Sequence, residues 1–214
     1  MKGLLKKDFF LVLKSWPIML GIFVLATAIM VFLNATAGIL SFTAIFFLMQ
    51  GVASIITDRM CGWNLYQTTF PVSRSKAIME KYLFSLVCGV IGLVIGFLTC
   101  LCVGWPDQES LLVSGLIGGI LSFSAMAAGI PLLIALPKST FAAAISASFI
   151  PGAVCIVLWN QALNRQSALA AASQGAIAFT MRTDLLWSLL AIMAGLCLIS
   201  WLVMPWLLSR KDQR

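Results

Sequence analysis

The chain has 214 residues, of which 61% are hydrophobic and only 10% are charged. Soluble domains are roughly half apolar and about a quarter charged, so this composition excludes an ordinary soluble protein, and we expect one membrane-embedded bundle without a separate soluble domain. The net charge of +7 lies in short segments without a basic face that carries aromatic stacking groups, which argues against nucleic acid as a partner.

The first segment, residues 1–15, is basic and apolar, and we predict that it forms an amphipathic helix. On a helical wheel most of its Leu, Val and Phe residues share one half and its lysines share the other, although Asp8 falls on the apolar half. We expect this helix to lie on the inner membrane surface; the alternative is a cytoplasmic extension of the first membrane span. Pro17 suits the first turn of that span, where its missing N–H costs little.

Six apolar stretches follow, and none of them has a charged residue or a histidine in its interior. Each has roughly 20 or more residues, which is enough for an α-helix to cross about 30 Å of hydrocarbon. The sequence therefore predicts an all-α, polytopic membrane protein with six transmembrane helices. The predicted spans are residues 16–35, 38–57, 82–104, 111–136, 140–159 and 184–208, with Asp184 at the water boundary.

Glycines and prolines within the spans predict close packing and bends. Two pairs, Gly92 with Gly96 and Gly115 with Gly119, have the GxxxG spacing that lets membrane helices approach closely. Pro131 and Pro151 are expected to kink the fourth and fifth spans.

The distribution of positive charge predicts the topology. All but two of the 14 Lys and Arg residues lie in the termini, in the long connection 58–81 or beside Pro137, which are all on one side of the predicted bundle. By the positive-inside rule both termini and the connection 58–81 are cytoplasmic, and the other long connection, 160–183, is extracellular. The latter is rich in Ala and Gln, so we expect a short helix within it.

The chain lacks the residue patterns of a membrane enzyme. It has no histidine, no CxxC pair, no nucleotide-binding P-loop and no carboxylate cluster in a span, so we expect neither a catalytic residue nor a metal site. Ion-driven transport usually leaves buried ionisable groups along its path, and the spans contain none. Gln50 is the most polar residue deep in a span; it could line a translocation path, although we favour a hydrogen bond to a neighbouring helix.

The connection 58–81 is the most informative segment, because it mixes charges with Trp63, Tyr66 and Phe70. An amphipathic helix from about residue 61 to 69, ended by Pro71, would present an apolar stripe. Ser73 can cap the next helix. Two interpretations remain open, a helix that docks on a partner protein and a helix that lies on the lipid surface.

The same segment resembles the ABC-2 type permease family. The resemblance lies in an acidic–basic pair followed by Gly, an apolar position, Gln and then Pro-Val-Ser-Arg before the third span. The opening Met-Lys-Gly-Leu-Leu-Lys-Lys-Asp-Phe resembles the start of small Firmicute-type permeases of this family, a group that includes exporters of phenol-soluble modulins. This chain has Asp58 where Glu is commoner, and Trp63 where many relatives have a small or polar residue.

The resemblance implies a multi-pass subunit of the plasma membrane, with toxin or antimicrobial-type peptides as cargo. Spans without charge suit an amphipathic or lipid-like cargo, and we expect export because nothing in the sequence suggests a site for an external binding protein. It implies a second permease chain, identical or different, and a separate P-loop ATPase subunit that binds ATP and Mg²⁺, so this chain itself needs no cofactor. Membrane lipid is a further partner. An alternative is a passive channel or oligomeric pore. The residues that would face the ATPase are Asp58, Arg59, Gly62, Trp63, Leu65, Gln67, Pro71, Ser73 and Arg74.

Overall fold

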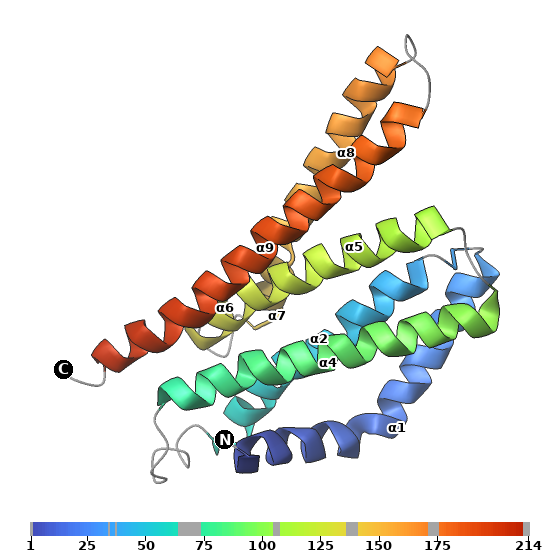
Figure 1. Cartoon of the computed structure of the whole chain (residues 1–214). Coiled ribbons are helices and arrows are strands. Elements are labelled where there is room, and N and C mark those ends of the chain that lie inside the picture. The colour runs from blue at the N-terminus through green and yellow to red at the C-terminus, as the bar shows by residue number, and fades with distance from the viewer. Residues whose placement is uncertain are drawn as a thin grey trace.

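The structure is a computed structural model, and it describes residues 2–33, 35–36, 38–63, 74–104, 108–135, 141–170 and 176–211. Every regular element in these ranges is a helix, which confirms the all-α prediction for the described part of the chain. The helices are arranged as an elongated bundle (Figure 1). They are α1 (Lys2–Phe32), α2 (Gly38–Met60), α4 (Arg74–Val103), α5 (Gln108–Ser124), the π-helix η1 (Ala125–Gly129), α6 (Ile130–Ala135), α7 (Phe141–Ser148), α8 (Ile150–Ala170) and α9 (Ala176–Lys211).

Five helical segments among the described residues are long and apolar enough to cross a membrane. They lie in α1, α2, α4, the continuous run from α5 to α6, and α9, and so correspond to five of the six predicted spans. The remaining predicted span, 140–159, is not one continuous helix. Phe149 lies in a turn between α7 and α8, and Pro151 is the second residue of α8, where a missing N–H is tolerated.

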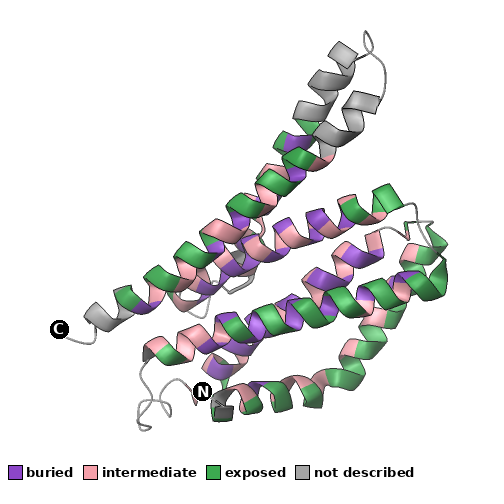
Figure 2. Ribbon diagram, in the orientation of Figure 1, coloured by how far each residue is buried: buried purple, intermediate pink, exposed green. Residues whose placement is uncertain are grey.

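Helix α1 joins the two elements that the sequence predicts separately at its start. It runs without interruption from Lys2 to Phe32 with Pro17 inside it, and it is clearly bent, so that its first part lies at an angle to the rest (Figure 1). Proline removes one backbone hydrogen bond and its ring clashes with the preceding turn, which explains the bend. Of the five spans α1 is the least buried, and most of its length is exposed (Figure 2). That its first part lies on the inner membrane surface remains a prediction.

Close packing of α2 against α4 forms the centre of the bundle, as the first glycine pair predicts. A Cβ atom added at Gly92 would lie 2.6 Å from the carbonyl oxygen of Thr43, so only glycine permits this approach. The second pair behaves differently, because Gly115 faces α2 and Gly119 faces Leu190 of α9.

The predicted kink near Pro131 takes the form of the π-helix η1, which ends two residues before the proline. Pro131 cannot donate the hydrogen bond that the Ala127 carbonyl would receive in an α-helix. The Ser200 hydroxyl of α9 donates to that carbonyl instead, at 3.0 Å, and it also lies 2.6 Å from the Tyr82 hydroxyl of α4. A break in one helix thus becomes a polar link among three.

The connection 160–183 is helical where it is described, but it does not form a separate short helix. Residues 160–170 continue α8, and residues 176–183 belong to the start of α9. These two helices extend together beyond the ends of the others (Figure 1). Residues 171–175 lie outside the described part of the chain.

Candidate functional site

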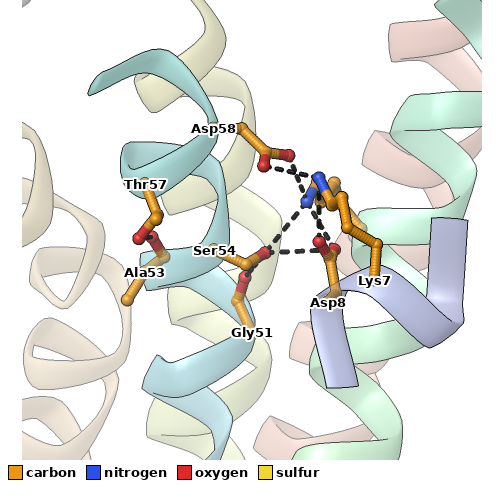
Figure 3. A network of polar contacts seen from close by, with 8 residues as sticks. Lys7, Asp8, Gly51, Ala53, Ser54, Thr57 and Asp58 are labelled. Atoms are coloured by element: carbon orange, nitrogen blue, oxygen red, sulfur yellow. Dashed lines mark hydrogen bonds and ion pairs between the residues drawn. The ribbon is translucent and has the colours of Figure 1, made fainter. Parts of the chain in front are cut away.

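Four charged side chains meet between the N-terminal part of α1, the last turn of α2 and the first turns of α4 (Figure 3). Residues 58–60 and 74–81 of the predicted connection 58–81 thus belong to α2 and α4. Lys7 and Asp8 come from α1, Asp58 from α2 and Lys81 from α4. Asp8 is 0% exposed and Asp58 is 5% exposed, so both carboxylates are inside the protein. We call these four residues the ion ring.

Each lysine in the ion ring bridges both aspartates. The Lys7 ammonium lies 2.5 Å from Oδ1 of Asp58 and 3.1 Å from Oδ1 of Asp8. The Lys81 ammonium lies 2.6 Å from Oδ2 of Asp58 and also pairs with Oδ2 of Asp8. Each of the four carboxylate oxygens is therefore within ion-pair distance of an ammonium group, which offsets part of the cost of removing these charges from water, although Oδ1 of Asp8 accepts no hydrogen bond among the described residues.

Polar and aromatic neighbours extend the ion ring. The Ser54 hydroxyl accepts a hydrogen bond from Lys81 at 3.1 Å and donates one to the Gly51 carbonyl at 2.7 Å. The Lys7 ammonium lies 4.5 Å from the ring centroid of Trp63, within the range of a cation–π interaction. The ring is thereby linked to the first residues of the connection itself.

The first four of the predicted ATPase-facing residues lie in different environments. Asp58 is buried in the ion ring and does not reach the surface. Arg59 is half-buried, and its Nη2 donates to the Ile134 carbonyl of α6 at 2.6 Å. Gly62 is half-buried with a φ of 68°, a left-handed conformation that ends α2 and that glycine adopts without strain. Trp63 is half-buried against Lys7.

The remaining predicted docking residues cannot be placed in the same way. Leu65, Gln67, Pro71 and Ser73 lie outside the described residues, and Arg74 is described only as the first backbone position of α4. The helix predicted from about residue 61 to 69 does not begin at its first residues, because Cys61 and Gly62 form a turn after α2, and residues 64–69 are outside the described part.

Gln50 lies at an apolar groove between α1, α2 and α4, with a volume of about 540 Å³. Its amide Nε2 donates to the Phe46 carbonyl of its own helix at 3.4 Å, in place of the expected bond to a neighbouring helix. We call this hollow the aromatic groove. Its aromatic lining is Phe9, Trp16, Phe23, Phe46, Phe47 and Phe84.

Sequence reasoning missed the ion ring, although one signal was present. Asp8 was the residue that disturbed the apolar half of the N-terminal wheel, and a carboxylate at an inward-facing position needs a cation beside it. Its partner Lys81 is 73 positions away, so the sequence alone could not supply it. Within the described residues no group of three or more His, Cys, Asp or Glu residues could hold a metal ion.

Comparison with protein families gives one match, to the family described as ABC-2 family transporter protein, and it covers residues 3–208. No curated protein and no solved structure matches the chain. The family match begins before the ion ring in α1 and ends near the end of α9, so it includes every structural feature described above. The chain therefore belongs to the ABC-2 family of transporter proteins.

Proposed function

We propose that this permease exports amphipathic or lipid-like cargo, with toxin or antimicrobial-type peptides as the first candidates, by ATP-driven alternating access. As a member of the ABC-2 family the chain is the membrane permease subunit of an ABC transporter, and the family typically works with a separate ATPase subunit. ATP and Mg²⁺ belong to that partner in this proposal. Spans without interior charge suit a cargo that is itself partly apolar.

The observation that carries the proposal is the ion ring, because it connects both ends of the segment 58–81 to α1. Asp58 precedes the segment, Lys81 closes it, and Lys7 and Asp8 belong to α1. Separating these charges would leave buried ions without partners, which is costly. A force applied to the segment is therefore transmitted to α1, α2 and α4 together.

In this mechanism the predicted docking residues divide into two groups. Arg59, Gly62 and Trp63, with the later positions from Leu65 to Arg74, form the surface that meets the ATPase. Asp58 is buried beneath that surface, and its ion pairs with Lys7 and Lys81 transmit a movement of the surface to α1 and α4. Two permease chains and two ATPase subunits make up the transporter, and Gln50 lines the translocation path.

The proposed topology has six membrane crossings with both termini and residues 58–81 in the cytoplasm. Helices α7 and α8 together form the fifth crossing, supported by the apolar segment Ile150–Gln161 of α8. The residues 160–183 then lie on the extracellular side. The excess of Lys and Arg near the termini and in 58–81 supports this orientation.

Co-expression with candidate P-loop ATPases tests the proposal. We expect the wild-type chain to retain one ATPase through detergent purification and to change its rate of ATP hydrolysis. The double variant Trp63→Ala/Arg74→Glu should reduce this coupled rate at least about tenfold, equivalent to about 1.4 kcal/mol, without unfolding the bundle.

The control is Trp187→Ala/Lys14→Glu, which combines a Trp→Ala change with a reversal of a basic charge at exposed positions outside the segment 58–81. It should couple like the wild type. Equal coupling by both double variants would remove segment 58–81 from the ATPase interface. Ion conductance by the chain alone, with no ATPase retained, would favour a passive channel.

A further inference from the structure

We infer that the aromatic groove binds one anionic bilayer lipid, with an acyl chain between α1 and the α2–α4 pair and the headgroup beside Lys6. The groove is a hollow of about 540 Å³ within helices that are long and apolar enough to span the membrane. This volume is in the range of small-molecule sites. Gln50, which is on the translocation path in the proposed mechanism, also lines this groove, so the inference rests on the proposed function in placing a bound lipid beside that path. Its test uses neither the cargo nor the ATPase.

One face of α1 forms a wall of the groove along most of its length. Leu5, Phe9, Val12, Trp16 and Phe23 lie three, four or seven positions apart, so they share a face of the helix on both sides of the bend. The rest of α1 contributes little to the core, and α1 is the least buried span. A chain in the groove would fill the space that separates this helix from its neighbours.

The opposite wall comes from α2 and α4. The rings of Phe46 and Phe47 pack edge to face, with their centroids 5.7 Å apart. Across the groove, the centroids of the Phe47 and Trp16 rings are 6.1 Å apart. From α4, Phe84 and Val87 face the same hollow. An elongated apolar ligand fits such walls, because they offer dispersion contacts along its length.

Charge decides which lipid is favoured. An apolar groove alone gains little, since the surrounding lipid tails are equally apolar. Lys6 is exposed and lines the groove, with its ammonium 5.9 Å from the Phe10 ring centroid. The ammonium group of the neighbouring Lys7 already pairs with the two aspartates of the ion ring. Lys6 is thus placed to attract an anionic headgroup at the membrane surface.

Two valines on α4 give a matched test of the groove. Val87 lines it and is 41% exposed, whereas Val90 does not line it and is 52% exposed. The full-length chain is purified from vesicles of phosphatidylcholine and phosphatidylglycerol, and retained lipid is counted by native mass spectrometry. We expect wild type and Val90→Trp to retain one phosphatidylglycerol per chain, and Val87→Trp to retain at least about fivefold less.

Val24→Trp, on the α1 wall, repeats the test should Val87→Trp not fold. Lys6→Gln should lower the preference for phosphatidylglycerol over phosphatidylcholine about fivefold, whereas Lys76→Gln, at an exposed position on α4 away from the groove, should leave it unchanged.

Equal retention by the Val87 and Val90 variants would overturn the site. Equal retention of the two lipids by the wild type would overturn the role of Lys6. Loss of chain-to-chain cross-linking in Val87→Trp, with lipid retention unchanged, would assign the groove to a second copy and overturn the lipid. None of these readouts involves ATP, so they are independent of the proposed export.

Discussion

Buried charge is concentrated in a few residues at one end of the bundle. Asp8 and Asp58 each face two ammonium groups, and Lys7 and Lys81 each face two carboxylates. Replacing all of them with apolar residues could be neutral, but removing one leaves two buried ions of the opposite charge without full compensation. The ion ring therefore constrains how α1, α2 and α4 meet more than it adds net stability.

Lys81→Met tests this asymmetry. It keeps a side chain of similar length, removes the cation that bridges both aspartates, and should lower the free energy of unfolding by about 3–5 kcal/mol. Denaturant titration in detergent, followed by tryptophan fluorescence, gives the measurement. Lys76→Met on the exposed side of α4 is the control and should change it by less than about 0.5 kcal/mol. Similar losses in both variants would show that the ring contributes nothing specific.

At the scale of the helices, the irregular turn before Pro131 has a structural role. Because Pro131 has no N–H, the Ala127 carbonyl is available to the Ser200 hydroxyl, which donates to it and so links α9 to η1. The same hydroxyl also contacts the Tyr82 hydroxyl of α4. A free backbone acceptor inside a bundle is costly, so its partner is as important as the proline. Such π-turns often occur at functional sites.

A double-mutant cycle tests the link between Ser200 and Pro131. Ser200→Ala should cost about 1–3 kcal/mol, because the Ala127 carbonyl loses its donor. Adding Pro131→Ala should recover part of that cost, since a backbone N–H at position 131 can donate to Ala127 in a regular helix. Ser188→Ala is the control, because this exposed hydroxyl donates to the Leu185 carbonyl of its own helix, at 2.7 Å. Strictly additive costs would exclude the compensation.

At the scale of the whole molecule, the ion ring lies at the end of the bundle where α2 ends and α4 begins (Figure 1). Helix α1 reaches that end through its N-terminal part. The proposed orientation puts this end in the cytoplasm, where an ATPase subunit can reach it.

Chemical labelling of Cys61 tests the proposed orientation. Cys61 is exposed just after α2. Cys102, near the opposite end of α4, is also exposed, Cys155 is half-buried, and the other three cysteines, Cys88, Cys100 and Cys197, are buried. A membrane-impermeant maleimide should label Cys61 in inside-out vesicles and leave it unlabelled in intact cells. Cys61→Ser identifies the signal, because it should remove the labelling found only in the inverted vesicles. Labelling of Cys61 in intact cells would place the docking segment outside and contradict the export mechanism.

The sequence by itself determined the helical class, five of the spans, the close approach at Gly92 and the irregularity near Pro131. These depend on local properties, namely uninterrupted apolar length, absence of a side chain and absence of an N–H. In the predicted span 140–159 the expected kink near Pro151 corresponds to a turn at Phe149, which divides the described residues 141–159 between α7 and α8, and that this span crosses the membrane stays a prediction.

Only the tertiary structure decided which charges meet. Asp58 reads as a surface residue because it begins a polar connection, yet it is buried, because α1 brings Lys7 to it from 51 positions away. The aromatic groove likewise requires three helices that are separate in sequence. Burial and pairing depend on which helices approach, and that is set by packing across the whole bundle, whereas span length is set by the bilayer and can be read residue by residue.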